Sequence, residues 1–172
     1  MNLNSLSDLY RHMQWADAGV WQAVFAAESA LADQKITEYF YHLHLVQHAF
    51  LRAWRDEPRD TPFPKFDDVR SLRSWGQAYY REIFEHLEKL TDEGISKPAV
   101  LPWTELVEKQ LGQAPAAITL SDMMLQVPLH SQYHRGQINA RLRAVGGEPP
   151  LVDYIAWLWL GRPEANWDFK SE

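Results

Sequence analysis

The sequence predicts an all-α fold: a four-helix bundle with a long crossover between its third and fourth helices and a short helix at its C-terminus. Four long segments repeat apolar residues at the spacing of an amphipathic helix. Prolines and glycines interrupt the chain between these segments, and one of the interruptions is long. A chain of 172 residues can bury a sizeable core. We therefore expect one domain over residues 1–172, in which helices with one long connection form a bundle.

The first two helices are expected at about residues 3–30 and 36–55. The apolar positions of the first recur at helical spacing: Leu6, Leu9, Tyr10, Met13, Val20, Val24 and Phe25. Ser5 or Ser7 is a candidate cap for its start, and Thr37 is a candidate cap for the second helix. A stretch with several prolines follows the second helix, so we expect a loop before the third.

Two further long helices are expected at about residues 67–90 and 121–144, and a short one at about 152–160. Two consecutive glycines soon after the fourth long helix give it a stop signal. The stretch from Ile95 to Ala117 contains three prolines and one glycine. We expect this stretch to be a long linker with some strand or turn content.

Composition excludes several classes of function. The chain has 17 Lys and Arg against 23 Asp and Glu, whereas binding to nucleic acids or anionic membranes needs an excess of basic residues. No apolar run approaches the ~20 residues of a membrane span, and the N-terminus lacks the pattern of a signal peptide. We therefore expect a small-molecule substrate and no nucleic-acid or membrane partner.

The chain has no cysteine and seven histidines. The lack of cysteine excludes disulfides, thiolate metal sites and a cysteine nucleophile, and it fits a reducing cytoplasm, where we expect the protein. Any transition metal must then be held by His nitrogens and carboxylate oxygens.

Aromatic residues are abundant, with eight Trp, seven Tyr and seven Phe, and most are expected to fill the core. Three tryptophans near the C-terminus, Trp157, Trp159 and Trp167, are candidates for a homodimer interface.

The fourth helix contains a histidine pair, His130 and His134, whose i,i+4 spacing places both imidazoles on one helical face. Ser131 stands where zincin proteases have their catalytic Glu, so that hydrolytic motif is incomplete. Apolar and polar residues share the face of the pair: Met123, Val127, Gln137, Ile138 and Arg141. Because buried polar groups need partners, the pair either binds a metal ion or consists of core histidines bonded to carbonyls and hydroxyls.

A third ligand is expected from the second helix, which contains His42, His44 and His48. A helical wheel places His42 on an apolar face with Tyr39, Leu43, Val46, Ala49, Phe50 and Ala53. It places His44 and His48 on the opposite side, which we interpret as the solvent side. His42 is therefore the candidate to join the pair. The two remaining histidines, His12 and His86, are expected at the surface or at an edge.

The sequence resembles the DinB/YfiT-like superfamily of four-helix-bundle metalloproteins. The strongest match, HSQYHRGQINARLRAVGGEPP at residues 130–150, is similar to the family's last bundle helix, in which two His precede Arg-Gly-Gln. The segment that begins at His42, HLHLVQHAFL, is similar to the second helix, in which an aromatic residue and Leu follow a His after eight residues. The segments HMQWADAGVW and TLSDMM also resemble family patterns.

The resemblance implies an up-down-down-up bundle that binds a divalent metal, zinc or nickel, through His42, His130 and His134. Relatives include transferases and isomerases that use a low-molecular-weight thiol such as bacillithiol or mycothiol. We therefore expect a metal-dependent enzyme of the DinB type, a thiol-dependent S-transferase whose thiol arrives as a cosubstrate. The alternatives are a metal-dependent hydrolase and a non-catalytic metal-binding or interaction bundle.

The catalytic residues stay open at this point. No residue clearly qualifies as a general base. Asp17 and Glu38 are candidates whose positions relative to the histidines the sequence does not predict. Gln137 is one turn beyond the histidine pair, where it could orient a ligand. Arg141 either pairs with an anionic substrate or is a solvated residue at the helix end.

Overall fold

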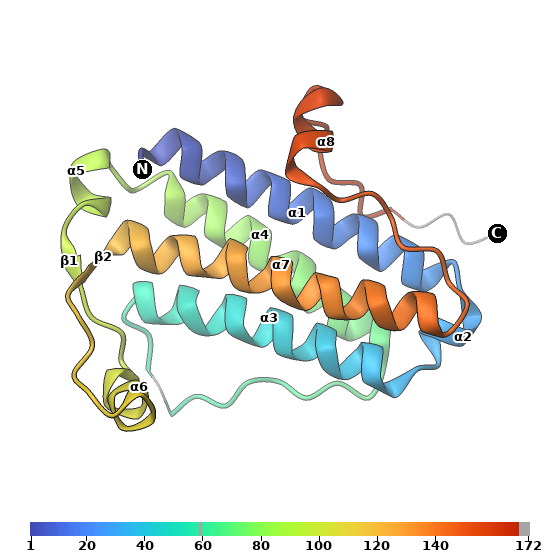
Figure 1. Ribbon diagram of the computed structural model, residues 1–172, viewed down its shortest axis with the longest axis horizontal. Coiled ribbons are helices and arrows are strands. Elements are labelled where there is room, and N and C mark those ends of the chain that lie inside the picture. The colour runs from blue at the N-terminus through green and yellow to red at the C-terminus, as the bar shows by residue number, and fades with distance from the viewer. Residues whose placement is uncertain (59, 169–172) are drawn as a thin grey trace.

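The computed structural model describes residues 1–58 and 60–168, which form eight helices and two short strands. The four long helices are α1 (Leu3–Phe25), α3 (Gln34–Trp54), α4 (Val69–Leu87) and α7 (Leu120–Ala144). The short ones are α2 (Glu28–Leu31), α5 (Asp92–Ile95), α6 (Thr104–Leu111) and α8 (Tyr154–Trp159). The prediction of an all-α bundle is confirmed (Figure 1).

Contacts between the long helices show how they run. The Tyr10 hydroxyl, early in α1, donates to the Met124 carbonyl, early in α7, at 2.9 Å. Arg141, late in α7, pairs with Asp33 at the start of α3. Thus α1 and α7 share one direction and α3 runs opposite to α7. Figure 1 shows α4 running beside α3 in the same direction, so the chain between them travels the length of the bundle.

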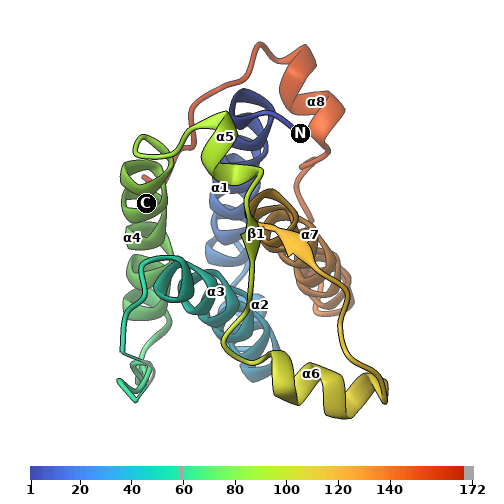
Figure 2. The same cartoon turned by 90° about the vertical axis from the view of Figure 1, so that its left-hand side faces the viewer.

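The long connection between α4 and α7 stays at one end of the bundle (Figure 1). It contains α5, the strand β1 (Pro98–Ala99), α6 and the strand β2 (Ile118–Thr119), and the two strands pair antiparallel. The strand content matches the prediction for this stretch, whereas the helix α6 was not expected. Figure 2, seen along the bundle, shows α6 beyond α3 and α7 and α8 beyond α1.

Helix starts lie within two residues of the predicted ones, but the caps of α1 and α3 differ from the predicted residues. Asn2 caps α1 by accepting a hydrogen bond from the Ser5 amide at 2.8 Å, and Asp33 caps α3 by accepting from the Ile36 amide at 3.0 Å. The candidate caps Ser5, Ser7 and Thr37 all lie inside helices, so this prediction was wrong. Asn and Asp are effective caps because their side-chain oxygens reach the free amides of the first turn.

The interior of the bundle is strongly aromatic. Trp21 of α1 is fully buried and stacks on Phe40 of α3, with ring centroids 3.6 Å apart. The α3–α4 contact is close at Gly76, where an added Cβ would lie 2.3 Å from Nε2 of His44. Only glycine therefore fits there without moving the buried His44 ring. This close contact positions α3, which contributes a residue to the site described next.

Candidate metal centre

Three histidines converge between α3 and α7. His42 of α3 and His130 and His134 of α7 each offer one ring nitrogen, and these three atoms all lie within 4.8 Å of one another. The ring centroids are 4.3 to 5.4 Å apart. Tetrahedral coordination with Zn–N bonds of about 2.1 Å separates the ligand nitrogens by roughly 3.4 Å, so modest side-chain movement closes the set on one ion. No other such group of His, Asp and Glu occurs among the residues that the structure describes.

A hydrogen bond selects the free nitrogen of His134. Nδ1 of His134 donates to Oε1 of Gln137 at 2.7 Å, and Nε2 of Gln137 donates to the Tyr133 hydroxyl at 3.2 Å. Because Nδ1 carries the proton, the lone pair lies on Nε2. A partner of this kind fixes the tautomer and the ring orientation of metal-binding histidines. Gln137 therefore orients His134.

The electrostatics of the cluster favour neutral rings. Burial, followed by repulsion from His134 and His42, lowers the pKa of His130 to about 4. Burial and then His134 also lower the pKa of His42. Nε2 of His130 is buried and has no hydrogen-bond partner among the described residues. A neutral imidazole with a buried, unpaired nitrogen is a ready ligand for a cation, so the residues present fit a metal ion.

The helical-wheel argument for α3 was wrong about burial, although it chose the histidine that joins the pair. His42 is exposed, whereas His44 is fully buried and His48 is 7% exposed. The polar side of α3 faces α1 and α4, not solvent, because polar partners inside the bundle satisfy it. His42 joins the cluster from the exposed side of α3, whereas His130 is half-buried and His134 is buried.

His44 cannot take part in metal binding in this arrangement, because both of its nitrogens are engaged. Its Nε2 accepts from Nε1 of Trp21 at 3.0 Å, and its Nδ1 donates to Oε1 of Gln47 at 2.8 Å. His48 stacks on Trp75, with centroids 4.2 Å apart, and its Nε2 donates to the Trp75 carbonyl at 3.1 Å.

Neither of the two other histidines belongs to the cluster. His12, expected at the surface or an edge, is buried, because the C-terminal segment covers it and its Nε2 donates to the Val152 carbonyl at 2.9 Å. His86 is partly buried and lies against Trp54.

A buried polar network, which sequence reasoning missed, lies inside the bundle behind the cluster. Asp17 of α1 is fully buried and accepts hydrogen bonds from Arg135 at 2.7 Å, from Gln47 at 2.9 Å and from the Tyr80 hydroxyl. Gln47 also donates to Ser131 at 3.1 Å. All four long helices contribute to this network.

The network bears directly on the cluster, because Ser131 and Arg135 each follow a cluster histidine in α7. Its contacts fix the rotation of α7 against α1 and α3 and so the positions of His130 and His134. Polar residues next to the histidine pair, with an Asp on the apolar stripe of the first helix between Met13 and Val20, were the available signal in the sequence.

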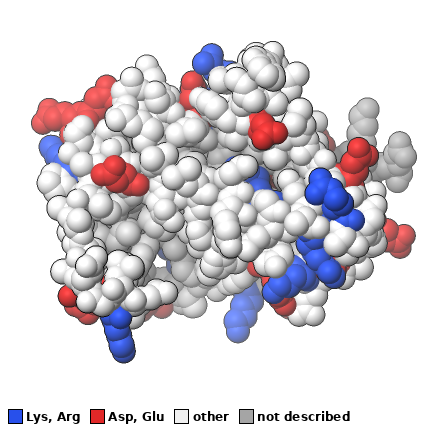
Figure 3. All heavy atoms as spheres, in the orientation of Figure 1, with Lys and Arg blue, Asp and Glu red and all other residues white. Residues whose placement is uncertain are grey.

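The remaining candidates have other partners. Asp17 is committed to the network, and Glu38 forms an exposed ion pair with Lys35 at 3.0 Å. Arg141, for which two roles were open, pairs with Asp33 at 2.6 Å. Figure 3 shows Lys and Arg side chains gathered over the end of the bundle where α7 ends and α3 begins.

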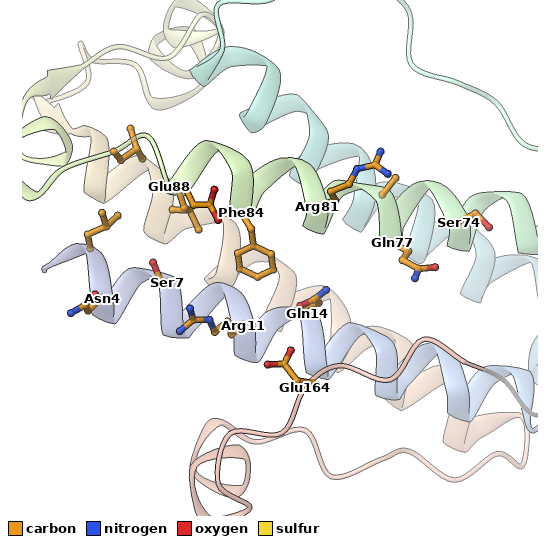
Figure 4. Close-up of a pocket in the computed structure, with 14 residues that line it drawn as sticks. Asn4, Ser7, Arg11, Gln14, Ser74, Gln77, Arg81, Phe84, Glu88 and Glu164 are labelled. Atoms are coloured by element: carbon orange, nitrogen blue, oxygen red, sulfur yellow. The ribbon is translucent and has the colours of Figure 1, made fainter.

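A wide cavity of about 910 Å³ lies on another side of the molecule, between α1 and α4. Its lining is mainly polar and contains no histidine. Figure 4 shows Phe84 reaching from α4 toward α1, where Ser7, Arg11 and Gln14 lie along the groove. Cavity size alone would therefore direct attention away from the cluster, whose chemistry is the more specific signal.

Comparison with known proteins is informative at the level of the family. No curated protein and no solved structure matches the chain significantly. In the described part of the chain, no helix has the length and apolar character needed to cross a membrane. The model of the DinB family matches residues 1–165, which is nearly the whole sequence and includes all three clustered histidines. The chain belongs to the DinB family.

Proposed function

We propose that the chain binds a divalent transition metal through His42, His130 and His134 and is a metal-dependent enzyme. The carrying observation is the convergence of three imidazoles, one of which has a buried and unpaired nitrogen. Three neutral protein ligands leave a coordination position open, which is typical of catalytic rather than structural sites. The exposure of His42 leaves that position accessible from solvent.

Thiol transfer is the reaction class that these residues support best. A bound divalent ion would supply the charge that lowers the pKa of a coordinated thiol or water. Hydrolysis also calls for a general base, and the two carboxylates considered for that role, Asp17 and Glu38, are engaged elsewhere. Since the chain has no cysteine, the sulfur must come from a low-molecular-weight thiol cosubstrate. We therefore propose a thiol-dependent S-transferase.

In this proposal the chain's own residues have three tasks. The three imidazoles hold the ion, and Gln137 keeps the lone pair of His134 directed at it. The Asp17 network fixes the position of α7 against α1 and α3. Zinc and nickel are the proposed metals, because both accept three imidazoles. We also propose that residues 1–172 form one domain.

The test begins with untagged protein, because nickel-affinity purification introduces its own metal. Elemental analysis is expected to give one zinc or nickel per chain, and the loaded protein is expected to react with a panel of thiol adducts. His42→Ala, His130→Ala and His134→Ala are expected to lose metal and activity, whereas His86→Ala serves as a matched control outside the cluster. Full activity in all three cluster variants would overturn the proposal of a metal-dependent enzyme. Stoichiometric metal without any reaction would favour a non-catalytic metal-binding bundle.

We also propose a homodimer, although fewer of the three C-terminal tryptophans are available for its interface than the sequence indicated. Trp157 and Trp167 are buried within the chain, so they are not free to form an interface. Trp159 is 80% exposed, and the adjacent Leu160 and Leu151, which precedes α8, are exposed as well. Light scattering of the wild type and of Trp159→Ser would test this surface, because the variant is expected to be monomeric.

A further inference from the structure

A second cavity lies beside the C-terminal half of α3. Its volume is about 320 Å³, at the small end of the range of ligand pockets. Its apolar lining comes from three parts of the chain: Ala49, Ala53, Phe63, Val100, Pro102 and Trp103. Edge-to-face packing on Phe50, with centroids 5.1 Å apart, holds the Trp103 ring.

The cavity and the histidine cluster share one face of α3. Ala49 and Ala53 follow His42 by seven and eleven residues, which returns each of them to nearly the same side of the helix. At 1.5 Å per residue, Ala49 lies about 10 Å from His42 along the helix axis. The apolar, partly buried Val46 lies between them, one turn from His42. A single extended molecule can therefore reach both places.

The basic group at the cavity is already engaged by other residues. The Arg52 guanidinium lies 4.2 Å from the centroid of the Phe63 ring, donates to the Thr61 carbonyl at 2.9 Å and is 3.8 Å from the Glu57 carboxylate. Asp56 also lines the cavity. An anionic group would meet two carboxylates there, whereas a neutral aromatic or branched aliphatic group would meet alanine, Phe63 and Trp103.

We propose that this cavity receives the apolar part of the substrate whose reacting group binds at the histidine cluster. The proposal rests on the proposed function and specifies its substrate class: an amphipathic molecule with a neutral aromatic or branched group about 10 Å from the metal-binding group. The cavity selects by shape and apolar contact, and the ion holds the polar end.

The test uses the full chain loaded with Co²⁺, whose visible spectrum reports thiol coordination. Two probes are compared, ethanethiol and a phenylpentyl thiol that is long enough to span the distance. The phenylpentyl thiol is expected to bind at least tenfold more tightly. Ala53→Phe, which fills the cavity, is expected to abolish this advantage and to leave the Kd of ethanethiol within about twofold. Ala140→Phe, at an exposed position of α7, is the matched control and is expected to retain it.

A second variant protects the test against misfolding of Ala53→Phe. Val100 is 80% exposed, so Val100→Asp adds a charge to the cavity wall with little cost to the fold, and it is expected to reduce the advantage severalfold. Equal affinities of the two thiols, or an advantage that survives both variants, would overturn the proposal. If Co²⁺ and ethanethiol bind but the phenylpentyl group adds nothing, only the cavity proposal fails. If the chain takes up no Co²⁺, the proposed function fails with it.

Discussion

The buried ion pair of Asp17 and Arg135 gives the sharpest prediction for stability. The two side chains are 0% and 2% exposed, and their charged atoms are 2.7 Å apart. Asp17→Ala removes the carboxylate and leaves the Arg135 charge in the core. Tyr80 and Gln47 lose an acceptor as well. Removal of one partner from a buried ion pair costs about 3–5 kcal/mol, which for a chain of this size lowers Tm by roughly 6–20 °C.

The assay is urea unfolding followed by circular dichroism, with Arg135→Met and the double variant completing a cycle. The double variant is expected to lose at least about 1 kcal/mol less than the sum of the single losses, because removing both charges leaves neither unpaired. Asp8→Ala is the control, since its partners Arg11 and Arg162 are at the surface and such pairs contribute about 0–1 kcal/mol each. A loss for Asp17→Ala as small as that of Asp8→Ala, or simple additivity in the cycle, would refute the reasoning.

Three further predictions address packing, pH and ligand orientation. Gly76→Ala is expected to destabilise the fold by about 1–3 kcal/mol, because the new Cβ meets the pinned His44 ring, whereas Gly136→Ala has open space and is expected to stabilise it by about 0.5–1 kcal/mol. Equal effects in urea unfolding would contradict the packing argument. Burial lowers the pKa of His48 from 6.5 to about 4, so the unfolded chain binds more protons in this window. The contribution of His48 to the free energy of unfolding is therefore present above pH 6.5 and lost toward pH 4. The loss is about 2 kcal/mol between pH 7 and pH 5, so the free energy of unfolding of His48→Gln should fall correspondingly less between these two pH values. Gln137→Leu is expected to weaken Co²⁺ binding about 10–100-fold in a spectroscopic titration, because the imidazole it orients is released, and unchanged affinity would show that the hydrogen bond plays no such part.

The fold was predictable mainly because α1, α3 and α4 carry clear apolar periodicity. The elements that were missed or displaced depend on weaker signals. Helix α6 has eight residues, none of them buried, and lies in a stretch where prolines favour a loop interpretation. The caps were misplaced because Ser5, Ser7 and Thr37, near the helix starts, are residue types that also serve as caps. The actual caps, Asn2 and Asp33, precede them and bond the free amides.

The histidine cluster was predictable only in part. The i,i+4 spacing of His130 and His134 is a local property, so it can be read from the sequence. The burial of His44 and His48 is not local, because it depends on Trp21 of α1 and on Trp75 of α4. A helical wheel treats every polar side as a solvent side, and it fails where another helix supplies the hydrogen bonds. Family resemblance, not burial, was the sound reason for choosing His42.

The links between α3 and α7 have a consequence for how the chain would acquire the proposed ion. Arg141 binds Asp33, and Gln47 binds Ser131, so protein contacts alone hold the two helices together before and after His42 of α3. Under the proposed function, folding and metal uptake would then be separate reactions, unlike those of zinc fingers, in which the ion is needed for folding. A chelator should strip the chain without melting its helices, and one ion should exchange for another on the folded protein. Occupancy in the cell would then follow the supply of metals at the time of exchange rather than the history of folding.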